Sequence, residues 1–244
     1  MSLVIGLAGD SGAGKTSLLK FFENLWGNKL LVIEGDCYHK WERKSENWEN
    51  FTPLNPNANT LEKAETDIES LKNGKEASIS EYDHSTGKFK PPEIVNSKPY
   101  IIYAGLHSLY TEKLRKLEDI KIFLNTDEDL RLFWKLKRDV NERGYTKEKV
   151  QESIKKRIAD SKKYIKPQIL YADVIINIFD NNLNFEDLNY VPQVSMEIMI
   201  NKELIYTSDI LHILKNINFK ITEDEKFIKA TYEEKFELFQ SIHI

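Results

Sequence analysis

The chain has 244 residues, of which 41% are hydrophobic and 30% are charged, and its formal net charge is -4 at pH 7. This composition is typical of a globular protein, and the acidic balance argues against a general nucleic-acid binder, which presents a basic surface. The single cysteine, Cys37, excludes an internal disulfide framework and favours a reducing, cytoplasmic location.

Five short apolar segments alternate with amphipathic ones in the first three quarters of the chain. We predict strands at residues 3–8, 29–34, 99–103, 120–124 and 173–178. Apolar residues that recur every three to four positions predict helices starting near residues 18, 61, 130 and 150. Strands that alternate with helices indicate a parallel α/β sheet with right-handed crossovers.

Two irregular stretches interrupt this pattern. Residues 35–59 are polar and aromatic and contain two prolines, which predicts a long loop, and loops of this length inside compact domains are usually functional or disordered. Residues 78–98 predict irregular strand and turn.

The last quarter of the chain is less regular. Residues 193–206 alternate and then turn at Asn201-Lys202, which predicts an antiparallel hairpin, and helices are expected near residues 208–217 and 231–241. We expect one domain over residues 1–180 and an extension over residues 181–244 that packs on it. The N-terminus lacks the features of a signal peptide, and no apolar run approaches the ~20 residues that span a bilayer.

A glycine-rich motif joins the first predicted strand to the first helix. It reads Gly9-Asp10-Ser11-Gly12-Ala13-Gly14-Lys15-Thr16, followed by Ser17, and fits G-x-x-x-x-G-K-[ST] in the required context. Glycines let backbone N–H groups converge on phosphate oxygens, and the helix N-terminus adds partial positive charge. Lys15 can reach the β- and γ-phosphates of ATP, and the Thr16 hydroxyl can bind Mg²⁺. We expect Lys15 to be exposed before nucleotide binds.

An acidic and basic loop follows the second predicted strand. Asp36 lies just past the strand end, where ligands of open α/β sheets bind, and its carboxylate could accept the proton of an attacking hydroxyl. The residues alone leave this role and that of an ordinary loop aspartate nearly even. His39, Arg43 and Lys44 could bind a substrate phosphate, although a solvated charge run is the simpler interpretation.

A basic helix is the third candidate element. Lys135, Arg138 and Asp139 share one face of the predicted helix near residue 130, and Lys137 and Arg143 add charge near its end. Such a helix could close over ATP and stabilise the charge of the transition state. A solvated helix surface is the commoner explanation of such runs.

With these segments placed, residues 3–178 resemble the phosphoribulokinase/uridine kinase family. Several stretches are similar to phosphoribulokinases in particular: residues 4–12, 35–43, 54–59, 82–87 and 105–110. Residues 137–144, together with Pro167-Gln168 and Tyr171-Ala172-Asp173, are shared with uridine kinases and do not discriminate. The resemblance implies a P-loop kinase three-layer sandwich with a mainly parallel sheet, a C-terminal hairpin and helices, and it implies ATP and Mg²⁺ as cofactors.

The resemblance also implies roles for individual residues. It assigns catalysis to Asp36, Lys15 and Arg138, phosphate clamping to Lys135, Arg138 and Arg143, and metal binding to Thr16 and Asp36. The acceptor would contact His39, Arg43, Tyr82, His84 and Asp139.

One position departs from the family pattern. The family usually carries a glutamate at the end of the third predicted strand, where this chain has Ala104. The missing carboxylate would help to hold Mg²⁺, so we expect a higher magnesium requirement than in a typical relative.

The leading functional hypothesis is phosphorylation of a sugar-phosphate hydroxyl, with ribulose 5-phosphate as the first candidate. The alternatives are a uridine/cytidine kinase and a nucleotide-binding protein with weak or no catalysis, the latter suggested by Ala104. We expect a small-molecule acceptor and no nucleic-acid or membrane partner. The sequence leaves the oligomeric state open between a monomer and a homodimer or higher homo-oligomer.

Overall fold

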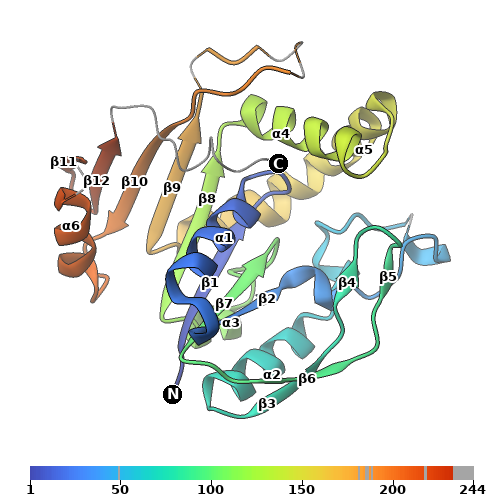
Figure 1. Ribbon diagram of the computed structural model, residues 1–244, viewed down its shortest axis with the longest axis horizontal. Helices are drawn as coiled ribbons and strands as arrows, with labels where there is room; N and C mark the ends of the chain where they lie inside the picture. Colours follow the sequence, from blue (N-terminus) through green and yellow to red (C-terminus); the bar gives the residue numbers. More distant parts are fainter. Residues whose placement is uncertain (49, 181, 185–186, 188, 217–218, 233–244) are drawn as a thin grey trace.

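The computed structural model describes residues 1–48, 50–180, 182–184, 187, 189–216 and 219–232. At its centre is an eight-stranded sheet in the order β11-β12-β10-β9-β8-β1-β7-β2 (Figure 1). Its strands are β1 (Leu3–Gly9), β2 (Leu30–Glu34), β7 (Tyr100–Gly105), β8 (Ile120–Thr126), β9 (Val174–Phe179), β10 (Ser195–Asn201), β11 (Lys220–Glu223) and β12 (Phe227–Tyr232).

The strands of this sheet fall into two groups by direction. β2, β7, β1, β8 and β9 are paired in parallel, whereas β10, β12 and β11 are added through antiparallel pairings. Two small ribbons lie outside the main sheet: β3 (Glu76–Ile79) with β6 (Glu93–Asn96), and β4 (Tyr82–Asp83) with β5 (Lys88–Phe89).

Helices cover both faces of the sheet. Because successive side chains of a strand point to opposite faces, Ile5 and Leu7 of β1 join one core cluster and Val4 joins another. The first cluster includes residues of α1 (Lys15–Trp26), α4 (Glu128–Asn141) and α6 (Thr207–Asn216). The second includes residues of α2 (Leu61–Lys72) and α3 (Glu112–Leu117). The predicted three-layer architecture with a mainly parallel sheet is therefore confirmed.

The five predicted strands of the parallel part are all present, and α5 (Lys147–Asp160) follows α4 as expected. The helix α3 was not predicted, because six residues are too few to establish a periodicity.

The prediction for residues 193–206 is only partly right. Residues 195–201 form β10 and a turn follows, but no second strand precedes α6. β10 pairs instead with β9 and β12, and the C-terminal hairpin consists of β11 and β12. Alternation identifies a strand but not its partner. The helix expected over 231–241 begins inside β12, and its remaining residues lie outside those described.

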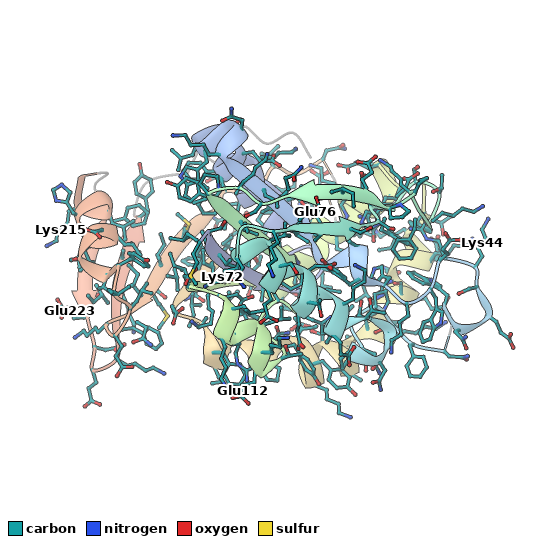
Figure 2. The ribbon with its side chains drawn as sticks, turned by 90° about the horizontal axis from the view of Figure 1, so that it is seen from below. Lys44, Lys72, Glu76, Glu112, Lys215 and Glu223 are labelled. Atoms are coloured by element: carbon teal, nitrogen blue, oxygen red, sulfur yellow. The ribbon has the colours of Figure 1, made fainter. Side chains whose placement is uncertain are left out.

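Two regions lie at opposite ends of the long axis of the molecule. Figure 2 shows Lys44, in the loop after β2, at one end, and Lys215 of α6 and Glu223 of β11 at the other. The loop of residues 35–60, apart from residue 49, contains three short 3₁₀ turns, Gly35–Tyr38, Glu46–Trp48 and Pro56–Ala58.

Candidate active site

The glycine-rich motif forms a phosphate loop between β1 and α1. Gly12 and Gly14 adopt φ values of 86° and 92°, in the left-handed region that favours glycine. A Cβ on Gly12 would also lie 2.8 Å from the backbone oxygen of Arg131 in α4. At the end of β8, the Thr126 hydroxyl donates a hydrogen bond to the Ala13 carbonyl oxygen at 2.8 Å, which fixes the loop over the sheet edge.

Lys15 is already engaged in this loop. Its Nζ donates to the carbonyl oxygens of Gly9 at 2.7 Å and Asp10 at 3.0 Å. Burial lowers the pKa of its ammonium group to about 8, against the opposing effect of the Asp10 charge. The expectation of an exposed lysine was therefore wrong: Lys15 is half-buried, because the curled loop offers it two carbonyl acceptors.

The Asp10 carboxylate links the phosphate loop to two other elements. Its carboxylate accepts hydrogen bonds from the Ser161 hydroxyl and from the backbone N–H of Ser11, and lies 3.6 Å from Arg131. Ser161 begins the π-helical turn that follows α5. The phosphate loop is thus connected directly to α4 and to the end of α5.

A large cavity opens beside the phosphate loop at the carboxyl edge of the parallel strands, with a volume of about 1030 Å³. This volume is at the upper end of the range of small-molecule sites. Of the predicted site residues, those on its wall are Ser11, Gly12, Ala13, Gly14, Lys15, Thr16, Ser17, Asp36, His39, Arg43, Lys44, Tyr82, His84, Lys135, Arg138, Asp139 and Arg143. Gly9 and Asp10 do not reach this wall, and contribute carbonyl oxygens to Lys15 instead.

Asp36 lies between two histidines in this cavity. Its Oδ1 is 3.3 Å from His39 Nε2, and its Oδ2 is 2.9 Å from His84 Nε2. Burial acts to raise the pKa of Asp36, but the hydrogen bonds and charges of the two histidines outweigh it and hold this pKa well below its usual range. The carboxylate is 32% exposed and oriented from both sides, as an acceptor for a substrate proton requires.

Each of these histidines has further support. His39 is buried, and its Nδ1 lies 2.9 Å from Asn59 Oδ1. The Tyr82 ring, at the start of β4, packs edge-on against both imidazoles at centroid distances of 5.1 and 5.3 Å. The long loop and the β4–β5 ribbon thus meet at Asp36, although more than 40 residues separate Asp36 from Tyr82 in the sequence.

Arg43 comes from the same loop. Its backbone N–H donates to the Gly87 carbonyl oxygen at 2.8 Å, and its guanidinium lies 5.9 Å from the centre of the Tyr145 ring. The Arg43 side chain is therefore held between the β4–β5 turn and the connection between α4 and α5.

The basic residues of α4 gather around Asp139. The Asp139 carboxylate accepts hydrogen bonds from Lys135 Nζ at 2.7 Å and from the Arg138 guanidinium at 2.9 and 3.0 Å, and Arg143 lies 3.5 Å away. Burial lowers the pKa of Lys135 to about 8. Asp139 is 5% exposed, and the three cations around it all line the cavity. Lys137 does not line the cavity and contacts the Tyr190 carbonyl oxygen at 3.5 Å.

Helix α5 adds residues that the sequence reasoning missed. Lys149, Ser153 and Arg157 all line the cavity. Their spacing of four residues places them on one helix face, a signal present in the sequence but masked by the apolar periodicity of Val150, Ile154 and Ile158. Glu34, the last residue of β2, was also not singled out, yet it lines the same cavity.

The donors on this wall fit a magnesium ion. Mg²⁺ takes oxygen ligands in octahedral geometry and usually combines one or two carboxylates with phosphate oxygens and waters. The Thr16 hydroxyl and the Asp36 carboxylate both line the cavity. Asp139 already has cationic partners in α4, so it is a poorer candidate ligand.

The parallel α/β sheet, the phosphate loop before α1 and the cationic α4 beside it together define a P-loop kinase fold. Among the described residues, none of the helices combines the length and hydropathy needed to cross a membrane. A sequence profile described as the Phosphoribulokinase / Uridine kinase family matches residues 4–184, and the chain belongs to this family.

Curated relatives include both branches of that family. The phosphoribulokinase of Synechocystis sp. is 38% identical over 182 residues, which cover 74% of this chain and 55% of the relative. The chloroplastic phosphoribulokinase of Spinacia oleracea is 32% identical over 204 residues, covering 76% and 51%. The uridine kinase of Macrococcus caseolyticus is 35% identical over 183 residues, covering 71% and 86%. The chain thus spans about half the length of these phosphoribulokinases.

Solved structures agree on the fold. The phosphoribulokinase from Rhodobacter spheroides superposes with a TM-score of 0.73 at 21% identity, covering 94% of this chain and 90% of that one.

Proposed function

We propose that this protein transfers the γ-phosphate of ATP to a hydroxyl group of a small sugar phosphate, with ribulose 5-phosphate as the first candidate. The observation that carries this proposal is the carboxylate of Asp36, held by two histidines on the wall that it shares with the phosphate loop. We propose a cytoplasmic location, which the single free thiol of Cys37 favours.

In the proposed reaction, Asp36 accepts the proton of the acceptor hydroxyl as its oxygen bonds to the γ-phosphorus. The bond from that phosphorus to the β–γ bridging oxygen breaks, and ADP leaves with the bridging oxygen. Asp36 need not be a strong base, because phosphoryl transfer depends mainly on positioning and charge stabilisation. His39 and His84 orient the carboxylate toward the cavity.

The cations of the cavity supply the charge stabilisation in this proposal. Lys15 leaves its carbonyl acceptors to contact the β- and γ-phosphates, while Arg138 and its neighbours in α4 face the transferred group. Bound Mg²⁺ would neutralise phosphate charge, with Thr16 and Asp36 as protein ligands.

We prefer a sugar phosphate as the acceptor because basic side chains on the cavity wall could bind the acceptor's own phosphate. Four basic side chains line the cavity from two elements: Arg43 and Lys44 from the loop of residues 35–60, and Lys149 and Arg157 from α5. Arginine suits bidentate contact with phosphate, and an uncharged nucleoside would not need this concentration of charge.

A uridine/cytidine kinase is the second candidate, and the coverage of relatives favours it. The chain matches 86% of the Macrococcus caseolyticus uridine kinase but 55% of the Synechocystis phosphoribulokinase.

A coupled assay of ADP release decides between the candidates. It compares ribulose 5-phosphate, other pentose phosphates, uridine, cytidine and pantothenate at equal Mg²⁺-ATP. We expect the highest kcat/KM with ribulose 5-phosphate. Faster turnover of uridine or cytidine would assign the chain to the nucleoside kinases, and nucleotide binding without turnover of any acceptor would indicate a binding protein.

A further inference from the structure

Position 104 lacks a carboxylate on the cavity wall beside the phosphate loop. Ala104 is the second-last residue of β7, is 4% exposed and lines the cavity. A P-loop kinase commonly places a magnesium-directed carboxylate at this edge of the sheet. A methyl group cannot bind a cation, so a carboxylate for this position would have to come from a neighbouring element.

β2 places such a carboxylate directly beside Ala104. Glu34 is the register partner of Ala104 in the parallel pairing of β2 with β7. Register partners point to the same face of a sheet, and neighbouring strands lie about 4.8 Å apart. Ile102, two residues before Ala104 in β7, and Leu30, four residues before Glu34 in β2, belong with Ala104 to the core cluster on the α1 face.

The two strand ends are held close together immediately after this pair. Gly35 follows Glu34 and Gly105 follows Ala104, and a Cβ on Gly105 would lie 2.9 Å from the Cα of Gly35. That approach is closer than a side chain permits, so glycine at both positions lets the backbones touch. The backbone of Glu34 is therefore fixed against β7.

The carboxylate of Glu34 has no protein partner in the described part of the chain, in either hydrogen bonds or ion pairs. The other two acids discussed for this cavity differ: Asp36 is paired with histidines, and Asp139 is paired with the cations of α4. Of these three acids, Glu34 is therefore the one whose carboxylate is available to a cation in the cavity.

We propose that Glu34, from β2, supplies the magnesium-directed carboxylate that position 104 of β7 lacks. The inference rests on the proposed function for the presence of Mg²⁺-ATP in this cavity, but not for the identity of the acceptor. It replaces the expectation of a high magnesium requirement, because the carboxylate is relocated to the adjacent strand.

The test uses binding, not only turnover. Isothermal titration measures ATP affinity at a series of Mg²⁺ concentrations for the wild-type chain and for Glu34→Gln, which keeps the side-chain shape. We expect Glu34→Gln to raise the Mg²⁺ concentration for half-maximal ATP binding by about tenfold or more, since loss of even an outer-shell partner of a metal ligand typically costs 10–100-fold in metal affinity. Without Mg²⁺, ATP affinity should not fall.

Two further variants make the result specific. Glu76→Gln removes an equal charge from β3, which does not line the cavity, and should leave the magnesium dependence unchanged. Ala104→Glu in the Glu34→Gln background returns a carboxylate to β7 and should restore the wild-type dependence. Ala104→Asp provides a smaller acid if melting curves show that glutamate unfolds the protein.

The outcomes separate this inference from the proposed function. Unchanged magnesium dependence in a folded Glu34→Gln variant would overturn the assignment, whatever the acceptor assay shows. A raised magnesium requirement supports it even if no acceptor is phosphorylated. Failure of both carboxylates at position 104 to restore binding would show that the two positions do not serve one ion.

Discussion

At the scale of single residues, the candidate site depends on how Asp36 is held. Two imidazoles approach its two oxygens, and each imidazole packs against the Tyr82 ring. The residue types could be selected from the sequence, since Asp36, His39 and His84 were all chosen there. The contact between these residues could not be predicted from the sequence, because His84 is positioned by a two-residue strand that has no detectable pattern.

The first prediction concerns the proton acceptor. Asp36→Asn keeps the shape of the side chain but cannot accept a proton, so turnover should fall by about 10²–10⁴-fold. ATP affinity, measured by titration, should remain near that of the wild type. Weakened ATP binding with little change in the chemical step would instead mean that Asp36 is only a metal ligand or a structural residue and not the proton acceptor.

The second prediction concerns the pH dependence of stability. Burial acts to lower the pKa of His39, but the hydrogen bond and charge of Asp36 outweigh it, so the net shift is upward from about 6.5. A raised pKa adds stability that is fully present below about pH 6.5 and is lost as pH rises through the folded-state value. His39→Gln should therefore destabilise the protein more at pH 5.5 than at pH 9, as urea unfolding would measure.

His107 provides the opposite case. Burial lowers its pKa to about 4, so its contribution to stability is complete above about pH 6.5 and declines toward pH 4. The destabilisation in His107→Gln should thus grow with pH while that in His39→Gln shrinks. Parallel pH trends in the two variants would contradict the assigned shifts.

At the scale of elements, the β4–β5 ribbon positions the loop of residues 35–60 at Arg43. Gly87, in its turn, has a φ of 74°, and a Cβ there would lie 2.5 Å from the Arg43 Cβ. The contact is backbone-supported, since Gly87 also accepts the Arg43 N–H.

The third prediction follows from this contact. Gly87→Ala should displace Arg43 and raise the acceptor KM by about tenfold or more, the scale of one charge-assisted hydrogen bond, while ATP affinity stays unchanged. Gly74→Ala is the matched control, because Gly74 has a φ of 77° but open space around its Cβ position. Equal effects on the acceptor KM in both variants would mean that backbone strain, and not displacement of Arg43, is responsible.

The elements that the sequence predicted are those with a strong period. The five parallel strands and the helices α1, α2, α4 and α5 follow from apolar repeats alone, and the phosphate loop follows from its glycines. Tertiary pairings were harder to predict. The residues that pair with β10 lie 16 to 26 positions before it in β9 and 26 to 36 positions after it in β12, and Lys149 and Arg157 matter only because α5 folds back over the cavity. Glu34 became interesting only when register placed it beside Ala104.

At the scale of the whole molecule, one sheet joins the parallel kinase strands to the C-terminal strands. The first core cluster contains Ile5 and Leu7 of β1 as well as Ile200 of β10 and Leu214 of α6. We propose that the described part of the extension, up to residue 232, unfolds together with residues 1–180 as one cooperative unit.

The fourth prediction tests this proposal. Ile200 is fully buried, so Ile200→Ala should lower the free energy of unfolding by about 2–5 kcal/mol. All four tryptophans precede residue 180, so their fluorescence reports on the kinase part alone. We expect their urea midpoint to fall, whereas Ile205→Ala, at an exposed position, should leave it unchanged. An unmoved midpoint in Ile200→Ala would show that the extension unfolds independently.

The distribution of charge around the cavity has a kinetic consequence. The basic side chains of its wall (Lys15, Lys20, Arg43, Lys44, Lys135, Arg138, Arg143, Lys149 and Arg157) outnumber the acidic ones (Glu34, Asp36, Asp139 and Glu142), although the formal charge of the chain is -4. The net charge of the chain alone would repel anions, so added salt would raise their association rate. The positive field of the basic cavity wall would attract anions, so added salt would lower that rate. We expect the association rate of a fluorescent ATP analogue, followed by stopped flow, to fall between about 20 and 300 mM KCl, with little change in dissociation. An association rate that rises with salt would mean that the net charge of the whole molecule, and not the basic cavity wall, governs the binding of the nucleotide.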